Sequence, residues 1–223
     1  MDVSKNLTEI KAKMEEACKY SNRNIDDVNL IAVTKYVTIE RTMEAIHAGI
    51  HNLGENRHEG FLEKFNYIGN KATWHFIGSL QSRKVKDIID KVDYLHSLDR
   101  LSLAKEIEKR ATSTINCFIQ VNVSGEGTKH GLRPDEVLPF VEEISEYSKI
   151  RVVGLMTMAP HTDDKELLHN VFRNLRNLRD TIREKEFHHA PCEFLSMGMS
   201  NDFDIAIMEG ATHIRIGSKL VGS

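Results

Sequence analysis

The sequence has few cysteines, no long apolar run and little net charge. Its three cysteines, Cys18, Cys117 and Cys192, are far apart and odd in number, so we expect reduced, buried thiols rather than a disulfide framework. No apolar run approaches the roughly 20 residues that a membrane-spanning helix needs. The first residues lead directly into an amphipathic pattern, without the apolar core of a signal peptide. We therefore expect a cytoplasmic protein.

The charge balance and the histidine spacing exclude two further classes of site. A net charge of −3 gives no electrostatic reason to expect binding to nucleic acid or to an anionic membrane. Among the eleven histidines, the pairs His188/His189 and His47/His51 have suitable spacing for metal ligands, but no third ligand is fixed by the sequence. We expect no metal site.

Strand-like and helix-like segments alternate along the 223 residues. Apolar residues at helical spacing predict an amphipathic helix over residues 3–20. The strands are expected over residues 28–34, at a short segment ending within 51–56, and over 73–77, 92–97, 115–123, 150–156, 192–196 and 212–216. Eight strands alternating with helices in this length predict a single domain over residues 1–223, a (β/α)8 TIM barrel with an extra N-terminal helix. A doubly wound open sheet is the alternative, but no GxGxxG follows the first strand to support it.

Side-chain alternation predicts which residues face the inside of the barrel. Trp74 and Phe76 suit packing against outer helices, which turns His75 inward. The same argument places Gln120, Arg215 and Lys35 on inward positions at the carboxyl ends of strands, where barrels carry their binding sites. Tyr36 has the opposite parity from Lys35, and we expect it to pack on the outside.

Lys35 and two late turns together suggest a ligand. The segments 196–202 and 215–218 are Gly/Ser-rich turns that could present backbone N–H groups to a phosphate. Lys35 follows a buried strand, so its amine could be desolvated and nucleophilic toward a carbonyl. It could equally be a surface lysine that begins a helix. An amine combined with a phosphate site suits an aldehyde that bears a phosphate, such as pyridoxal 5'-phosphate (PLP).

Six motifs resemble a known family over essentially the whole chain, in their order and spacing. They are Val33-Thr34-Lys35, the segments 52–56 (NLGEN), 74–81 (WHFIGSLQ) and 153–156 (VGLM), Ser196-Met197-Gly198-Met199-Ser200, and Arg215-Ile216-Gly217. This pattern is similar to that of the pyridoxal-phosphate homeostasis protein family, the single-domain relatives of the N-terminal barrel of alanine racemase. The resemblance implies a PLP fold-type III barrel.

The resemblance also implies the residues of the site. PLP is expected as an internal aldimine on Lys35, with Arg215 near the pyridine nitrogen. Asn56 and His75 match positions that line the ring pocket. The phosphate contacts are expected from Ser196, Gly198, Ser200, Gly217 and Ser218. Lys129 matches a loop lysine thought to influence release or transfer of the cofactor.

The expected role is that of a carrier. An arginine that donates to the pyridine nitrogen keeps it unprotonated, which makes the ring a weak electron sink. Racemisation needs an acid/base group on each face of the cofactor, and the chain has no second domain to supply one from a partner. We therefore expect no catalytic residue and a monomer that holds PLP and supplies apo-enzymes. The alternatives are a PLP-dependent amino-acid racemase and a cofactor-free Schiff-base aldolase.

Overall fold

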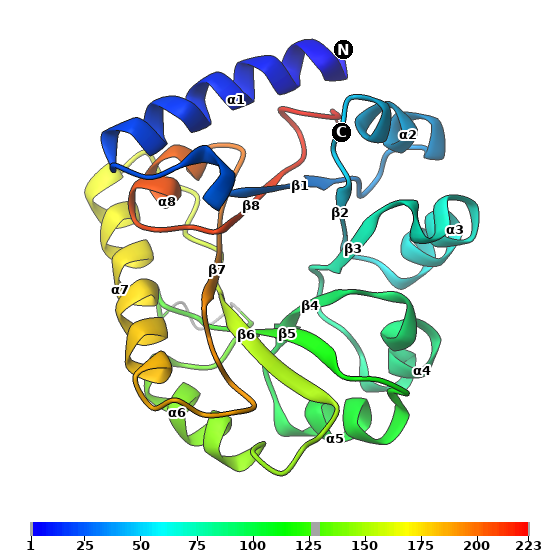
Figure 1. The fold of residues 1–223 in the computed structure, drawn as a ribbon, viewed down its shortest axis with the longest axis vertical. Helices are drawn as coiled ribbons and strands as arrows, with labels where there is room; N and C mark the ends of the chain where they lie inside the picture. Colours follow the sequence, from blue (N-terminus) through cyan, green and yellow to red (C-terminus); the bar gives the residue numbers. More distant parts are fainter. Residues whose placement is uncertain (1, 126–129, 223) are drawn as a thin grey trace.

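Eight short parallel strands close into a barrel, because each pairs with the strand before it and β8 pairs with β1 (Figure 1). The computed structural model describes residues 2–125 and 130–222. The strands are β1 (Asn29–Val33), β2 (Asn52–Glu55), β3 (Thr73–Phe76), β4 (Tyr94–Leu98), β5 (Ile115–Gln120), β6 (Ile150–Met156), β7 (Phe194–Met199) and β8 (His213–Ile216). This architecture confirms the predicted (β/α)8 barrel.

Helices surround the barrel, as Figure 1 shows when the molecule is viewed down its shortest axis. They are α1 (Val3–Tyr20), α2 (Ile39–His47), α3 (His58–Ile68), α4 (Val85–Ile88), α5 (Leu101–Arg110), α6 (Pro134–Glu143), α7 (Lys165–Arg183) and α8 (Phe203–Met208). The additional helix α1 begins after Asp2, whose side chain accepts the N–H groups of Ser4 and Lys5. Its apolar stripe is buried, and α1 packs beside α8.

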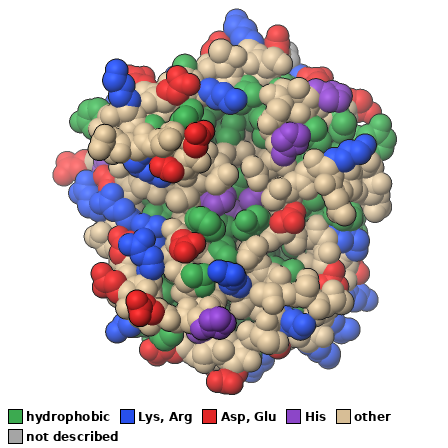
Figure 2. Space-filling view, in the orientation of Figure 1, with side chains coloured by type: hydrophobic (Ala, Val, Ile, Leu, Met, Phe, Trp, Pro, Cys, Tyr) green, Lys and Arg blue, Asp and Glu red, His purple; other side chains and the backbone are tan. Residues whose placement is uncertain are grey.

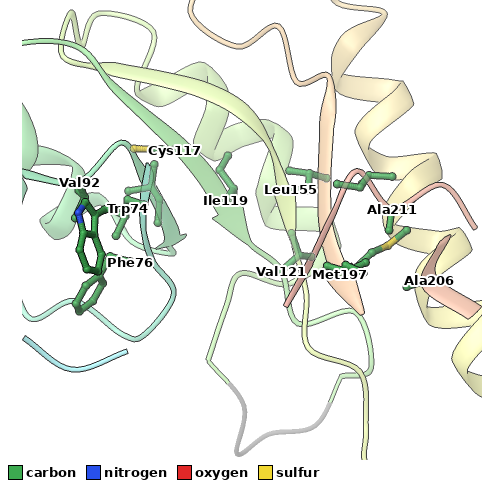
Figure 3. Packing of buried hydrophobic residues seen from close by; sticks show 14 of the residues in the cluster. Trp74, Phe76, Val92, Cys117, Ile119, Val121, Leu155, Met197, Ala206 and Ala211 are labelled. Atoms are coloured by element: carbon green, nitrogen blue, oxygen red, sulfur yellow. The ribbon is translucent and has the colours of Figure 1, made fainter. Parts of the chain in front are cut away.

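The main hydrophobic core lies between the barrel and its helices. On the outer face of β3, the Trp74 ring lies 5.4 Å from that of Phe61 in α3, edge to face, and the Phe76 ring lies 6.4 Å from the same phenylalanine. Figure 3 shows Trp74 and Phe76 close together among the buried residues. The predicted outward orientation of these two aromatic residues is therefore confirmed, and His75 between them points into the barrel.

Several strand ends differ from the prediction, among them β5, which stops at Gln120 instead of residue 123. The ends of β1 and β7 affect the site. β1 stops at Val33, because Tyr36 has a φ of +67° and the Val37 N–H bonds back to the Thr34 oxygen. β7 continues to Met199, which pairs with Arg215 of β8 after a register shift. Strand ends depend on such pairing and turns, which side-chain alternation alone does not reveal.

The surface carries charges of both signs. Figure 2 shows Lys/Arg and Asp/Glu side chains interspersed over the face in view, with histidine side chains near its centre. Within residues 2–125 and 130–222, no helix combines the length and the apolar character needed to cross a membrane. The same residues contain no group of three or more His, Cys, Asp or Glu side chains that could hold a metal ion.

Candidate functional site

A cavity of about 480 Å³ opens at the carboxyl ends of the strands. This volume is in the range of sites for small molecules and cofactors. Loops after β1, β2, β3, β6, β7 and β8 form its wall. Among the lining residues are six of the predicted site residues, Lys35, Asn56, Ser200, Arg215, Gly217 and Ser218.

The turns after β7 and β8 bring two serine hydroxyls together. Ser200 Oγ and Ser218 Oγ lie 3.3 Å apart at the edge of the cavity. A side chain at Gly217 would place its Cβ 3.4 Å from the Val33 side chain and oxygen, so the glycine allows the turn to lie against β1. Two adjacent hydroxyl donors from separate turns form a suitable cradle for a phosphate group.

Gly198 has a packing role between β7 and α8. It lies inside β7 with a φ of +91°, and a Cβ there would lie 2.6 Å from the Ala206 Cβ and 3.0 Å from the Phe203 Cα. It is not among the residues that line the cavity. The glycine therefore lets α8 approach β7, and the expected phosphate contact at this position stays a prediction.

Arg215 carries a buried positive charge at the floor of the cavity. Its Nη1 donates to Ser196 Oγ at 2.6 Å and its Nη2 donates to the Thr157 oxygen at 2.8 Å. Burial lowers the pKa of Arg215 to about 10, with partial compensation from the Asp202 carboxylate. The guanidinium therefore stays protonated at neutral pH and presents donors only.

A chain of hydrogen bonds continues from Ser196 into the barrel. Ser196 Oγ lies 2.9 Å from His96 Nδ1, His96 Nε2 lies 2.9 Å from His75 Nδ1, and His75 Nε2 lies 3.0 Å from Asn52 Oδ1. Burial lowers the pKa of both histidines well below the usual value, so both rings are neutral.

Neutral rings allow one consistent assignment of the protons in this chain. The Asn52 oxygen can only accept, so His75 donates to it through Nε2 and accepts from His96 at Nδ1. His96 then accepts the Ser196 hydroxyl proton, and Ser196 accepts from Arg215. Every bond runs in the same direction, from Arg215 to Asn52. The chain therefore anchors the guanidinium through a buried network in which both rings and the serine hydroxyl are paired.

Ser196 and His75 do not line the cavity, contrary to the prediction for both. Both are completely buried. Ser196 was expected at the end of its strand, but β7 continues three residues further, so its hydroxyl points into the barrel and meets Arg215. His75 bonds to Asn52, which begins β2, and its ring stacks on Tyr94, which begins β4, with 4.7 Å between centroids.

Lys35 lies in a turn and is exposed, so of the two alternatives that the sequence left open, the structure favours the surface lysine over the desolvated amine. The Val37 N–H bonds to the Thr34 oxygen at 3.3 Å, so Lys35 and Tyr36 are the two central residues of a tight turn. Tyr36 also lines the cavity and is 62% exposed, so the expected outer packing role is wrong. Its ring centroid lies 5.7 Å from the Lys35 ammonium and 4.7 Å from the Arg57 guanidinium.

Asn56 supplies an unsatisfied group at the cavity wall. Its Oδ1 is buried, and within the described residues it has no hydrogen-bond partner. Buried amides are normally paired, so a polar ligand at this wall is the natural partner. Lys129, the predicted loop lysine, lies outside the described residues.

The loop after β6 and the Asp202 side chain also line the cavity and were not among the predicted site residues. The loop after β6 contributes residues 158–162, including the exposed Met158 and His161. Asp202 accepts the Met199 N–H at 2.5 Å and so closes the turn that carries Ser200. The position of the loop directly after a barrel strand is a signal that could have identified it.

The comparison with protein families and curated relatives covers nearly the whole chain. The family model of the alanine racemase N-terminal domain matches residues 6–223. A protein of Aquifex aeolicus named pyridoxal phosphate homeostasis protein is 38% identical, and the match covers 100% of this chain and 98% of the relative. The protein of the same name from Haemophilus influenzae is 35% identical over 100% of this chain and 96% of its own.

Solved structures agree in fold. PipY of Synechococcus elongatus with PLP bound is 27% identical with a TM-score of 0.82, and the match covers 94% of this chain and 100% of that one. A Bifidobacterium adolescentis protein of unknown function is 30% identical with a TM-score of 0.89, over 98% of this chain and 94% of that one. Alanine racemase of Corynebacterium glutamicum is 13% identical with a TM-score of 0.73, over 94% of this chain and 60% of that one, and shows the shared fold.

Proposed function

Because this chain belongs to the alanine racemase N-terminal domain family, we propose that it binds PLP, takes part in PLP homeostasis and supplies the cofactor to apo-enzymes. The observation that carries the proposal is the meeting of three chemically different groups at one cavity. A primary amine on Lys35, a donor-only guanidinium on Arg215 and the Ser200–Ser218 hydroxyl pair all line it.

The residues present fit this cofactor. Ser200 and Ser218 would donate to its phosphate, and Arg215 would donate to its pyridine nitrogen. The unpaired Asn56 amide oxygen marks a polar position of the wall that a ligand would satisfy. When bound, PLP supplies an aldehyde that condenses with a primary amine, with loss of one water.

The properties of Arg215 favour a role in binding the cofactor over a role in catalysis. Its pKa remains near 10, so it offers a hydrogen bond without giving up a proton at neutral pH. Carbanion chemistry depends on how the protein tunes the ring nitrogen, and a donor that keeps its proton contributes little to it. Ser196 and the Thr157 oxygen keep the guanidinium in place, so this electrostatic setting is built into the barrel.

The exposure of Lys35 suits a carrier. An amine in an open turn can be reached by the cofactor and by a second amine that would take the cofactor away. A fully desolvated lysine would protect the cofactor but would also hinder its departure. The exposed position of Lys35 therefore supports a role in the supply of PLP to apo-enzymes.

Borohydride reduction followed by peptide mass mapping tests the binding site. After incubation with PLP, we expect a pyridoxyl-phosphate adduct on Lys35 and none at this peptide in Lys35→Ala. Lys219→Ala is the matched control, because Lys219 is exposed next to Ser218 and does not line the cavity. A principal adduct at another lysine would contradict the site.

Transfer is tested separately with a phosphatase that destroys free PLP. Loaded protein is mixed with an apo PLP-dependent enzyme in the presence of the phosphatase, and recovery of enzyme activity is followed. Direct supply predicts recovery under conditions where free PLP restores none. If the phosphatase abolishes recovery of enzyme activity equally for loaded protein and for free PLP, the cofactor is released into solution before it reaches the apo-enzyme.

Tyr36 supports a racemase as the second candidate, because its phenol lines the same cavity as Lys35. The test is exchange of the α-proton of amino acids into deuterated solvent, with the purified loaded protein. Sustained turnover that is lost in Tyr36→Phe would establish the enzyme and overturn the carrier. The cofactor-free aldolase predicts a protein without visible absorbance after incubation with PLP.

A further inference from the structure

A buried ion pair lies next to the turn that carries Lys35. Lys64 of α3 and Glu55, the last residue of β2, are 5% and 1% exposed. The Lys64 Nζ lies 2.6 Å from Glu55 Oε1. Neither residue belongs to the wall of the cofactor cavity, and the proposed function assigns them no role.

Both members of the pair bond to Thr34, the residue immediately before Lys35. The Thr34 hydroxyl donates to Glu55 Oε1 at 2.7 Å, and the Thr34 main-chain oxygen accepts from Lys64 Nζ at 2.7 Å. The Thr34 N–H donates to the Gly54 oxygen at 3.0 Å. All polar groups of Thr34 are thus held by β2 and α3.

The contact with the main-chain oxygen is the decisive one. That oxygen belongs to the peptide group that joins Thr34 to Lys35, so Lys64 fixes the orientation of this peptide plane. The same oxygen also accepts the Val37 N–H that closes the turn. The direction in which the Lys35 side chain leaves the strand follows from these two bonds.

The turn needs such a restraint. Tyr36 has a φ of +67°, a left-handed conformation that is unfavourable for a residue with a side chain. Strained backbone of this kind persists only where the surrounding structure holds it. Packing offers little help, because Lys35 and Tyr36 border the cofactor cavity on one side and a second cavity of about 630 Å³ on the other.

A buried ion pair is also a costly way to stabilise a fold. Desolvation of the two charges offsets much of their attraction, and apolar residues of similar volume often stabilise as well or better. The pair therefore fits a role in fixing one geometry. We propose that Lys64, Glu55 and Thr34 form a clamp that positions Lys35 for the cofactor, where the positioning for the cofactor rests on the proposed function.

The test uses the apo-protein and a charge-balanced double variant. Lys64→Met with Glu55→Gln removes both charges, so no unpaired buried charge remains. Lys13→Met with Glu9→Gln is the matched control, because it makes the same two changes at exposed positions of α1 that line neither cavity. Amide hydrogen exchange is measured over residues 35–38 and over β5, which reports on the rest of the barrel.

The clamp predicts faster exchange of residues 35–38 by about tenfold or more in the double variant, with β5 and the control unchanged. The rate of PLP incorporation at Lys35, measured by borohydride mapping, should fall by a similar factor in the double variant. The single variant Lys64→Arg keeps Glu55 and a positive charge, so its incorporation rate should lie between those of the double variant and wild type. Unchanged exchange of residues 35–38 in a folded double variant would overturn the clamp. If the double variant does not fold, Thr34→Val, which removes only the hydroxyl bond to Glu55, is judged by the same criterion.

The exchange measurement needs no cofactor, so it separates the two proposals. Faster exchange without any adduct on Lys35 would leave the clamp standing as a restraint on the turn and would reject the proposed binding site. An adduct on Lys35 with unchanged exchange of residues 35–38 would support the proposed binding site and reject the clamp.

Discussion

Arg215 and Ser196 meet inside the barrel, with the guanidinium Nη1 2.6 Å from the serine Oγ. This bond joins the cofactor cavity to the line of His96, His75 and Asn52 that runs into the barrel. The arginine at the cavity floor is thus held by residues that do not line the cavity.

Ser196→Ala should destabilise the protein, because it leaves both Arg215 Nη1 and His96 Nδ1 without their partner. We expect the free energy of unfolding to fall by about 1–3 kcal/mol, measured by urea denaturation. PLP affinity should also fall, since the guanidinium loses an anchor.

Ser97→Ala is the matched control for Ser196→Ala. Ser97 is equally buried, but its hydroxyl has no hydrogen-bond partner within the described residues. Its removal should be neutral or slightly stabilising, because no bond is lost and a desolvated group is removed. Equal destabilisation by the two substitutions would contradict the hydrogen-bond chain.

The two serines at the cavity edge should determine phosphate affinity. Each of Ser200→Ala and Ser218→Ala should weaken PLP binding about tenfold, since a hydrogen bond to a charged group contributes about 1.5–3 kcal/mol. Titration of the apo-protein with PLP measures the effect. Pyridoxal, which lacks the phosphate, should bind wild type and variants alike, whereas an equal loss for both ligands would place the phosphate elsewhere.

Gly198→Ala should destabilise through two separate effects. The positive φ costs about 1 kcal/mol, and the contact with Ala206 should add about 1–3 kcal/mol of overpacking. Gly49→Ala isolates the first effect, because Gly49 has a φ of +92° and no atom lies within 4 Å of the position that its Cβ would take. Thermal unfolding of both variants should show the larger loss at Gly198.

Stability should fall as the pH drops below 6.5. Burial and the Arg215 charge lower the pKa of His213 to about 4, below its unfolded value of 6.5. Between pH 6.5 and 4 the unfolded chain therefore binds a proton at His213 that the native state does not bind. The resulting decrease in the free energy of unfolding reaches about 3 kcal/mol at pH 4. Above pH 6.5 both states are neutral at this residue, and stability should not depend on it.

Urea unfolding at pH 7, 6 and 5 checks this dependence. His213→Gln should reduce the slope by up to about 1.4 kcal/mol per pH unit, whereas the exposed His47→Gln should leave it unchanged. A slope that is the same in wild type and His213→Gln would mean that His213 titrates normally in the folded protein. His75 and His96, whose pKa values are also lowered, should contribute in the same direction.

Local pattern was sufficient for the outline of this protein. The period of two in β3 separates Trp74 and Phe76 from His75, because alternate side chains of a strand always face opposite sides. The amphipathic spacing predicted α1 for the same reason, with a period of 3.6. Lys35 and Arg215 were also found from their places at strand ends, since the carboxyl ends of parallel strands meet at one mouth.

Tertiary structure decided how these residues are used. The residue at which a strand ends depends on its pairing with a neighbouring strand. Only the structure therefore shows that Ser196 lies inside the barrel and that Lys35 lies in an open turn. The partnership of Glu55 and Lys64 depends on how α3 returns to β2, which no local period encodes. Local sequence patterns predict the barrel and the kinds of groups at its mouth. Their hydrogen bonds, burial and orientation follow from contacts between distant elements.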